Sequence, residues 1–206
     1  GYRLMMGLQS GIEPTDFLND LKKVLKEHDV LDKPLAVDMP IITLGFKDIL
    51  TRAGIKVVDG GAIMREVRSI KTQDEIQCIK IALSICDKIF EEIRQAIRPG
   101  VRDTDIAAMI VYTAIKEGCT EYPSLLVNTG ENTCPNMMGY SDRVIRPGDM
   151  IFVDLAGVRW RGYGTCYYRT FTCGKATQQQ KEFYAECLRL LLDAEKQVKA
   201  GKTTAD

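Results

Sequence analysis

The sequence is short of histidine. Its 206 residues include one, His28, so no mechanism or metal site that needs two imidazoles can be built from this chain alone. His28 lies in a charged stretch, Lys-Glu-His-Asp, which is typical of a solvated surface segment. Whatever chemistry the chain supports must therefore rest on other side chains.

Excess charge and long apolar runs are also missing. Lysine plus arginine and aspartate plus glutamate number 28 each, and this balance argues against a nucleic-acid or anionic-membrane partner. No apolar run approaches the roughly 18–20 residues of a membrane span. Residues 1–6 contain no long apolar stretch of the kind a signal peptide needs. We expect a cytoplasmic protein.

The seven cysteines do not form a recognisable framework. Their number is odd and no Cys-x-x-Cys occurs. This pattern predicts free thiols in a reducing compartment rather than disulfides. Cys78 and Cys86 fall within a helical apolar pattern and are interpreted as core residues.

The first 59 residues alternate between helical and extended patterns. We expect helices at 15–28 and 43–53, and short buried strands at 35–39 and 55–59. The alternation predicts part of an α/β layer with a parallel sheet.

From residue 72 the apolar residues recur with the period of a long helix. Thr72 and Glu75 have the spacing of a capping box, in which each side chain binds a free backbone N–H of the other residue. An apolar seam follows and is expected to end at 99–100, where proline and glycine break a helix. A second helix is predicted over 103–118.

The second half of the chain begins with strand patterns. Strands are expected at 124–128, 150–154 and 167–171, with a turn at 146–149 and the last two strands forming a hairpin. A further capped helix is predicted over 177–199.

Two helix ends look alike. Gly100 and Gly201 are separated by 101 positions, and so are Asp105 and Asp206. We interpret this spacing as an internal duplication of helices and strands, which predicts that the native protein continues after Asp206. Coincidence remains open, because helix-Gly-Thr-Asp is a common joint between helices.

Five motifs occur in one order along the chain: 68–76, 98–100, 146–149 with 153–154, 162–163, and 169–171. Together they resemble the creatinase, prolidase and Xaa-Pro aminopeptidase family, peptidase family M24. The resemblance implies an α+β fold in which residues 1–65 are the C-terminal part of an α/β N-terminal domain. Residues 66–206 would then be the first half of a pseudo-twofold "pita-bread" catalytic domain.

The resemblance also locates the expected site. Metal-dependent members hold two divalent cations with two aspartates on this hairpin, and carboxylates are needed to neutralise such a pair. Asp154 keeps the first position, but Cys166 holds the second, with one more residue between them than the family pattern has. The family's first-half histidine falls on Asn136 or Met137. We therefore expect no bound metal and no other cofactor.

The return strand of the hairpin is more similar to the metal-free creatinase branch than to the peptidases. The candidate catalytic residues are Asp154, Cys166 and Asn136, and the candidate substrate-binding residues are Arg169 and Tyr163. Four of them have a structural alternative: Asp154 as a strand-end acid, Cys166 as a small apolar filler, Asn136 as a turn residue and Arg169 as an ion-pair partner.

Three functions stay open. The first is a metal-independent hydrolase of a C–N bond in a small molecule or short peptide, similar to creatinase and, by analogy, a homodimer. The second is a metal-dependent Xaa-Pro peptidase or lyase with altered ligands. The third is a non-catalytic pita-bread module that binds a peptide or protein.

Overall fold

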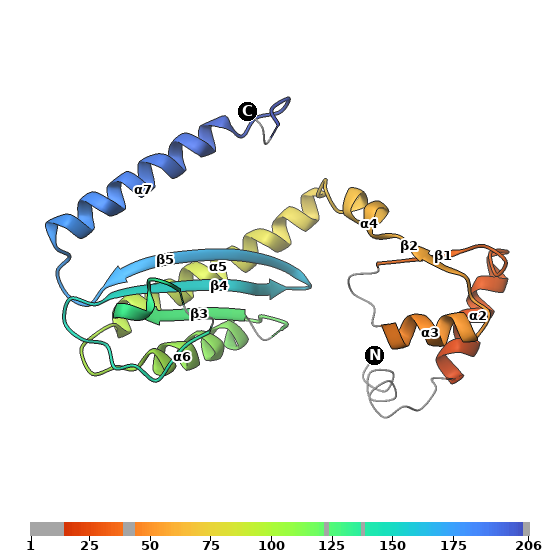
Figure 1. Ribbon diagram of the computed structural model, residues 1–206, viewed down its shortest axis with the longest axis horizontal. Coiled ribbons are helices and arrows are strands. Elements are labelled where there is room, and N and C mark those ends of the chain that lie inside the picture. Colours follow the sequence, from red (N-terminus) through yellow and green to blue (C-terminus); the bar gives the residue numbers. More distant parts are fainter. Residues whose placement is uncertain (1–14, 39–43, 122–123, 137–138, 204–206) are drawn as a thin grey trace. The chain divides into compact units, whose positions relative to one another are not determined.

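The computed structural model describes residues 15–38, 44–121, 124–136 and 139–203 (Figure 1). The chain forms two compact units, Gly1–Lys71 and Thr72–Asp206. Several sequence predictions fall outside the described residues: the end of the first strand, the start of the second helix, Met137, and the last residues of the second repeat segment. The domain assignment of 1–65 and 66–206 stays a prediction.

The first unit carries the predicted parallel pair of strands. Leu35 pairs with Val57 in parallel, and Leu18, Leu50 and Ile55 form a small core beside the strands. Its elements are α2 (Thr15–Glu27), β1 (Leu35–Val37), α3 (Leu44–Arg52), β2 (Val57–Asp59) and α4 (Gly61–Val67).

Helix α4 was not predicted, because its two leading glycines were interpreted as a break. The Gly61 N–H donates to Asp59 Oδ1 over 2.8 Å, so the preceding aspartate satisfies one of the free donors at the start of this helix. Glycine is strongly disfavoured in a helix interior but is tolerated at its start.

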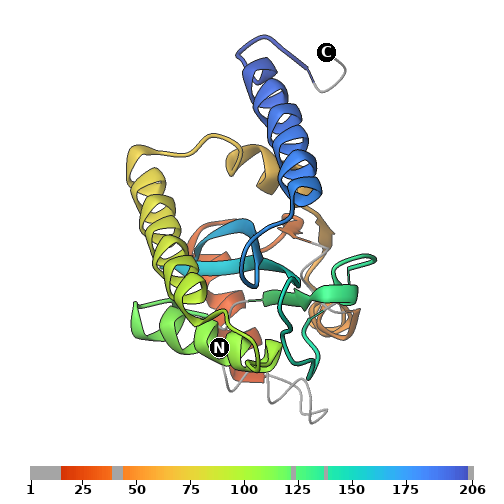
Figure 2. The same ribbon diagram turned by 90° about the vertical axis from the view of Figure 1, so that its left-hand side faces the viewer.

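The second unit is a three-stranded sheet with two helices on one face. The strand order is β3-β4-β5, with both pairs antiparallel, and α5 contacts β4 and β5 while α6 contacts β3 (Figures 1 and 2). Its elements are α5 (Gln73–Ala96), α6 (Asp103–Lys116), β3 (Ser124–Thr129), the short 3₁₀ turn η1 (Gly130–Asn132), β4 (Met150–Trp160), β5 (Tyr163–Thr172) and α7 (Gln178–Gln197).

The core lies between these helices and the sheet. Ile89 and Ile93 of α5 are fully buried, as are Val153 and Leu155 of β4. Val153 and Leu155 alternate along β4 with less buried residues, as expected where one face of a strand is covered. Burying each such side chain contributes about 1.5–3 kcal/mol, so this layer is the main source of stability in the unit.

The β4–β5 hairpin is longer than predicted. A two-residue turn at Arg161 and Gly162 joins the strands, with φ values of 52° and 84°. Positive φ at both central residues is typical of the type I′ turn, whose twist matches that of the flanking strands. The turn therefore allows pairing to continue up to Trp160 and Tyr163.

Capping boxes start two of the long helices, as predicted. Thr72 Oγ1 accepts from the Glu75 N–H over 3.2 Å, and Thr177 Oγ1 accepts from the Gln180 N–H over 3.2 Å. The side chains of Glu75 and Gln180 accept from the backbone N–H groups of the two threonines over 2.6 and 2.8 Å. The helices differ in packing, since α5 buries six side chains whereas none in α7 is buried.

Two cap substitutions in this 206-residue chain separate these roles. Thr72→Ala is expected to lower the free energy of unfolding by about 1 kcal/mol, because α5 is part of the core. Thr177→Ala is expected to change it far less, because α7 can fray without disturbing buried contacts. Urea unfolding measures the first effect and hydrogen exchange in α7 the second; equal losses of stability would contradict this assignment.

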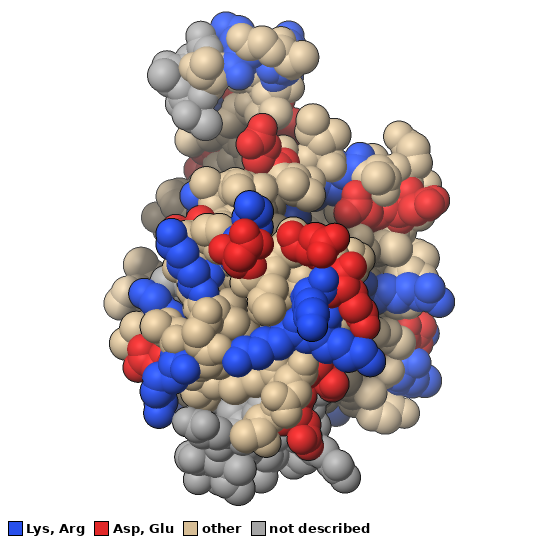
Figure 3. Space-filling model, turned by 90° about the vertical axis from the view of Figure 1, so that its right-hand side faces the viewer, with Lys and Arg blue, Asp and Glu red and all other residues tan. Residues whose placement is uncertain are grey.

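The surface shows no gathering of one charge on the face seen in Figure 3, where basic and acidic side chains are interspersed.

All seven cysteines are free, and Cys86 is fully buried, whereas Cys78 is only partly buried. Among the described residues no helix is both long enough and apolar enough to cross a membrane.

Candidate active site

The sheet has one covered and one open face. Helices α5 and α6 cover the face that carries Val153 and Leu155. The other face carries Phe152, Asp154 and Ala156, which are only partly buried. Asp154 is the one acidic residue of β4, so the strand's period of two places a carboxylate on the open face.

Asp154 and Cys166 are neighbours on the open face. Asp154 lies directly opposite Tyr168, and Cys166 lies opposite Ala156, so the thiol is the diagonal neighbour of the carboxylate. The Cys166 thiol donates to Asp154 Oδ1, with 3.6 Å between sulfur and oxygen. The structure therefore brings together the two positions at which the family resemblance predicted a ligand pair.

The thiol of this pair is held in its neutral form. The Cys166 side chain is exposed, but its partial desolvation raises the pKa of the thiol, and the negative charge and the hydrogen bond of Asp154 raise it further. A reactive cysteine needs the opposite environment, with nearby cations that lower its pKa. Cys166 is consequently suited to donate a hydrogen bond and poorly suited to act as a thiolate nucleophile.

The predicted substrate ligands do not join this pair. Arg169 lies opposite Val153, on the covered face, with its guanidinium 4.0 Å from the Tyr167 ring centre and 5.7 Å from that of Phe90. Arg169 therefore does not face the Asp154–Cys166 pair, and its role in substrate binding stays a prediction. The alternation of β5 places Arg169 and Cys166 on different faces.

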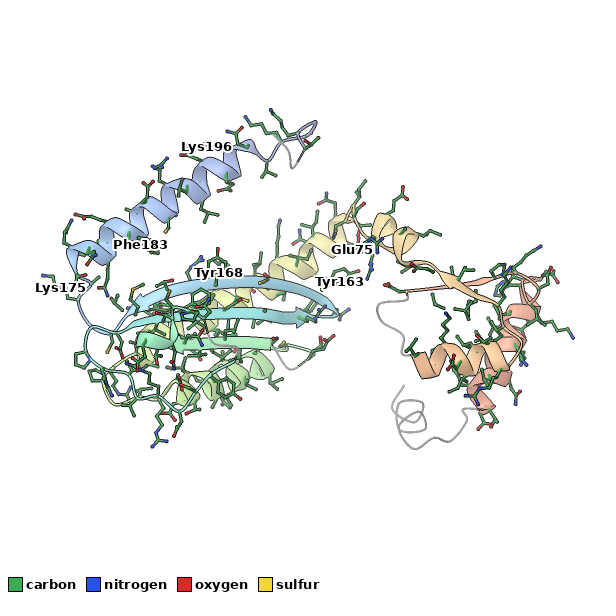
Figure 4. The ribbon with its side chains drawn as sticks, in the orientation of Figure 1. Glu75, Tyr163, Tyr168, Lys175, Phe183 and Lys196 are labelled. Carbon is green, nitrogen blue, oxygen red and sulfur yellow. The ribbon has the colours of Figure 1, made fainter. Side chains whose placement is uncertain are left out.

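Tyr163 lies at the start of β5, away from the pair. Its hydroxyl donates to Glu75 Oε1 over 3.0 Å, which links the hairpin to the first turn of α5 (Figure 4). This hydrogen bond is the main reason why the pKa of Tyr163 is raised. Tyr163 therefore ties the strand to the helix, and a role in substrate binding stays a prediction.

Asn136 is exposed in the loop after η1. It forms an isolated antiparallel bridge with Thr133. Among the hydrogen bonds of the described residues, none joins Asn136 to Asp154 or Cys166. Its catalytic role stays a prediction, while Met137 lies outside the described residues.

Tyr168 belongs to the open face but was not among the predicted site residues. Its ring centre lies 5.8 Å from that of Phe152, with the two rings tilted by 43°, and it contributes to a cavity of about 480 Å³ between β5 and α7. Phe183 projects from α7 toward the side of the hairpin on which Tyr168 lies (Figure 4). Counting strand pairs back from the hairpin turn does not place Tyr168 opposite Asp154, because the pairing is irregular between Ala156 and Val158.

The donors present do not fit a pair of hard divalent cations. Such cations require bridging carboxylates, but this pair supplies one carboxylate and one neutral thiol. The described residues contain no group of three or more histidine, cysteine, aspartate or glutamate side chains placed to hold a metal ion. We therefore derive no step through a metal from these residues.

Comparison with known proteins identifies relatives. A profile of metallopeptidase family M24 matches residues 77–206. The probable dipeptidase PepE of Mycobacterium bovis is 27% identical over 150 residues, covering 73% of this chain and 40% of that protein. The Xaa-Pro dipeptidase of Pyrococcus furiosus is 24% identical over 190 residues, covering 91% of this chain and 53% of that protein.

A solved structure supports the same relationship. The X-Pro aminopeptidase of Thermotoga maritima is similar with a TM-score of 0.71 and 27% identity, covering 88% of this chain and 50% of that one. The predicted α+β pita-bread fold is thereby confirmed. This chain spans only about half the length of the relatives that it matches.

Proposed function

This chain belongs to metallopeptidase family M24, and we propose that the full-length protein hydrolyses a C–N bond without a bound divalent metal. The substrate class is a small molecule or a short peptide, as for a creatinase-like member of the family. By analogy with the family, the proposal includes a homodimer in the cytoplasm.

The Asp154–Cys166 pair carries this proposal. At the second ligand position the thiol donates a hydrogen bond to Asp154 instead of sharing a cation with it. Replacing a bridging carboxylate with a neutral thiol removes one negative charge from the site, and two adjacent cations would then lack the charge that neutralises them. An ionised acid that is oriented by a hydrogen bond can instead serve as a general base.

The proposed chemistry uses Asp154 as the proton carrier. Asp154 accepts a proton from a water molecule as the water oxygen bonds to the substrate carbon. The C–N bond then breaks, and the proton passes to the leaving nitrogen, so that no oxidant or reductant is consumed. Cys166 acts through Asp154 by fixing the orientation of its carboxylate, because the thiol hydrogen bond occupies Oδ1 and leaves Oδ2 for water.

A second candidate is a metal-dependent dipeptidase with altered ligands. The family's description as metallopeptidases and the names of the two dipeptidase relatives favour it. Zinc accepts a cysteine ligand as a thiolate, which here would require deprotonation of a thiol whose pKa is raised.

Metal analysis of the full-length protein tests the proposal. We expect substoichiometric divalent metal after purification, and unchanged turnover of creatine or of a Xaa-Pro dipeptide after treatment with a chelator. The physical reason is the missing carboxylate at Cys166. Stoichiometric metal whose removal abolishes turnover would establish the second candidate instead.

A gain-of-ligand variant provides the matched control. Cys166→Asp restores two carboxylates at the ligand positions and is expected to bind Mn²⁺ at least about tenfold more tightly than the wild type in calorimetric titration. Cys187→Asp makes the same change at an exposed position on α7 and is expected to leave Mn²⁺ binding unchanged.

A further inference from the structure

We propose that a β-bulge at Gly157 decides which side chain of β5 faces Asp154, and that it selects Cys166 over Arg169. Gly157 is thus a positioning residue for the site. Its catalytic importance rests on the proposed function, but its effect on geometry does not.

The pairing of β4 with β5 changes by one residue at this point. On the side of the site, Asp154 lies opposite Tyr168 and Ala156 opposite Cys166. On the side of the turn, Val158 lies opposite Thr165. One residue of β4, Gly157, is left over between the two registers, as in a β-bulge.

Without the bulge the site would hold different residues. Regular pairing counted from the turn would continue past Val158 and Thr165 to set Gly157 opposite Cys166, and Asp154 opposite Arg169. Because opposite residues of antiparallel strands share a face, Asp154 and Arg169 would then lie on one face and Cys166 on the other. The single extra residue therefore exchanges an arginine for a thiol beside the carboxylate.

Glycine at the bulge has a conformational reason. Its φ is +97°, a region that residues with a side chain rarely adopt and that β-branched residues avoid. A Cβ added to Gly157 would meet the Ser124 backbone nitrogen at 3.6 Å, which is ordinary contact. The backbone angle, rather than lack of space, is what requires glycine here.

The bulge also explains the family departure in spacing. Asp154 and Cys166 are separated by one residue more than the family pattern predicts, yet they remain hydrogen-bonded. Removing Gly157 would join Ala156 directly to Val158 and leave the pairs on both sides intact. A deletion is thus expected to be better tolerated than substitution by a β-branched residue.

Alkylation of Cys166 in the full-length protein tests the inference. The exposed Cys134 and Cys187 are first replaced with serine, so that iodoacetamide reports mainly on Cys166. Deletion of Gly157 is expected to keep the alkylation rate within about twofold of the parent rate, because the thiol stays beside Asp154. The pH midpoint of alkylation is expected to stay within about a few tenths of a pH unit of the parent value. Gly157→Val is expected to change the rate at least about tenfold, because the bulge is disfavoured.

Two further variants keep the result interpretable. Gly157→Asn, which tolerates positive φ better than valine, is expected to resemble the parent even if the valine variant fails to fold. Asp154→Asn is expected to lower the pH midpoint of alkylation, because the neighbouring charge is removed. The inference is overturned if the deletion alters alkylation tenfold, or if a folded Gly157→Val variant reacts like the parent.

The outcome is separable from that of the proposed function. Alkylation reports the position of the thiol and needs neither substrate nor metal. If the Gly157 variants change alkylation as expected but the enzyme requires a metal, the inference is supported and the proposed function is refuted. If alkylation does not respond to the Gly157 variants but turnover needs no metal, the inference is refuted and the proposed function is supported.

Discussion

Asp154→Asn is expected to lower turnover by the full-length protein about 10³-fold, within the range measured for loss of a general acid or base. The amide keeps the size of the carboxylate and can still contact Cys166, but it cannot accept a proton from water. Steady-state kinetics on the substrate that the wild type turns over gives the ratio of the two kcat values.

A matched aspartate separates this effect from loss of a general surface charge. Asp142→Asn removes an exposed carboxylate of the same unit that pairs with Arg102 over 2.7 Å, and turnover is expected to stay unchanged. A folded Asp154→Asn variant with wild-type kcat would show that Asp154 is not the general base and would contradict the proposed chemistry.

Arg143→Met is expected to lower the free energy of unfolding by about 3–5 kcal/mol, because it leaves Asp149 without its partner. The Arg143 and Asp149 side chains are only 11% and 13% exposed. The guanidinium donates from both terminal nitrogens to the two Asp149 oxygens, and it also contacts Glu131 and Thr129. Urea unfolding at neutral pH measures the loss.

The same pair predicts a pH dependence. Burial alone would raise the pKa of Asp149, but hydrogen bonds from Arg143 and from the Arg146 N–H outweigh burial and hold the pKa below its usual value. The pair therefore stabilises the fold fully above the unfolded pKa of about 3.9, and the contribution is lost as the pH falls below that value. In Arg143→Met this part of the acid dependence should shrink.

An exposed arginine–aspartate pair is the control. Arg102→Met breaks the ion pair between Arg102 and Asp142, whose side chains are 52% and 69% exposed. This substitution is expected to lower the free energy of unfolding by at most about 1 kcal/mol. Comparable losses for the two arginines would show that burial of the Arg143 pair carries no special weight.

Local rules predicted much of the helical framework. The capping box at Thr72 and the break at 99–100 set the ends of α5 close to where the structure has them, because these ends depend on nearby backbone donors and acceptors. The parallel pairing of 35–37 with 57–59 followed from alternation of helices and strands. Helix α4 was missed because Gly60 and Gly61 were interpreted as the end of the preceding strand, whereas the Asp59 side chain accepts from the Gly61 N–H at the start of this helix.

The site was predicted in part, and register explains the difference. Asp154 and Cys166 were placed together by family spacing, and the structure keeps them in contact. Arg169 was named as a substrate-binding residue from the family motif, although its spacing of three residues from Cys166 already predicts the opposite face of a regular strand. Nothing in the sequence around Gly157 distinguishes a glycine in a β-bulge from a glycine in a loop.

The two-residue turn at Arg161 and Gly162 has a consequence for how the site assembles. It closes a hairpin whose two site residues are only 12 positions apart, so their meeting requires a short chain closure with a small entropic cost. Hairpins of this kind form in microseconds, whereas β3 must be brought in over a longer separation. The contact between thiol and carboxylate can thus precede docking of the helices, which makes its geometry a local property of one hairpin.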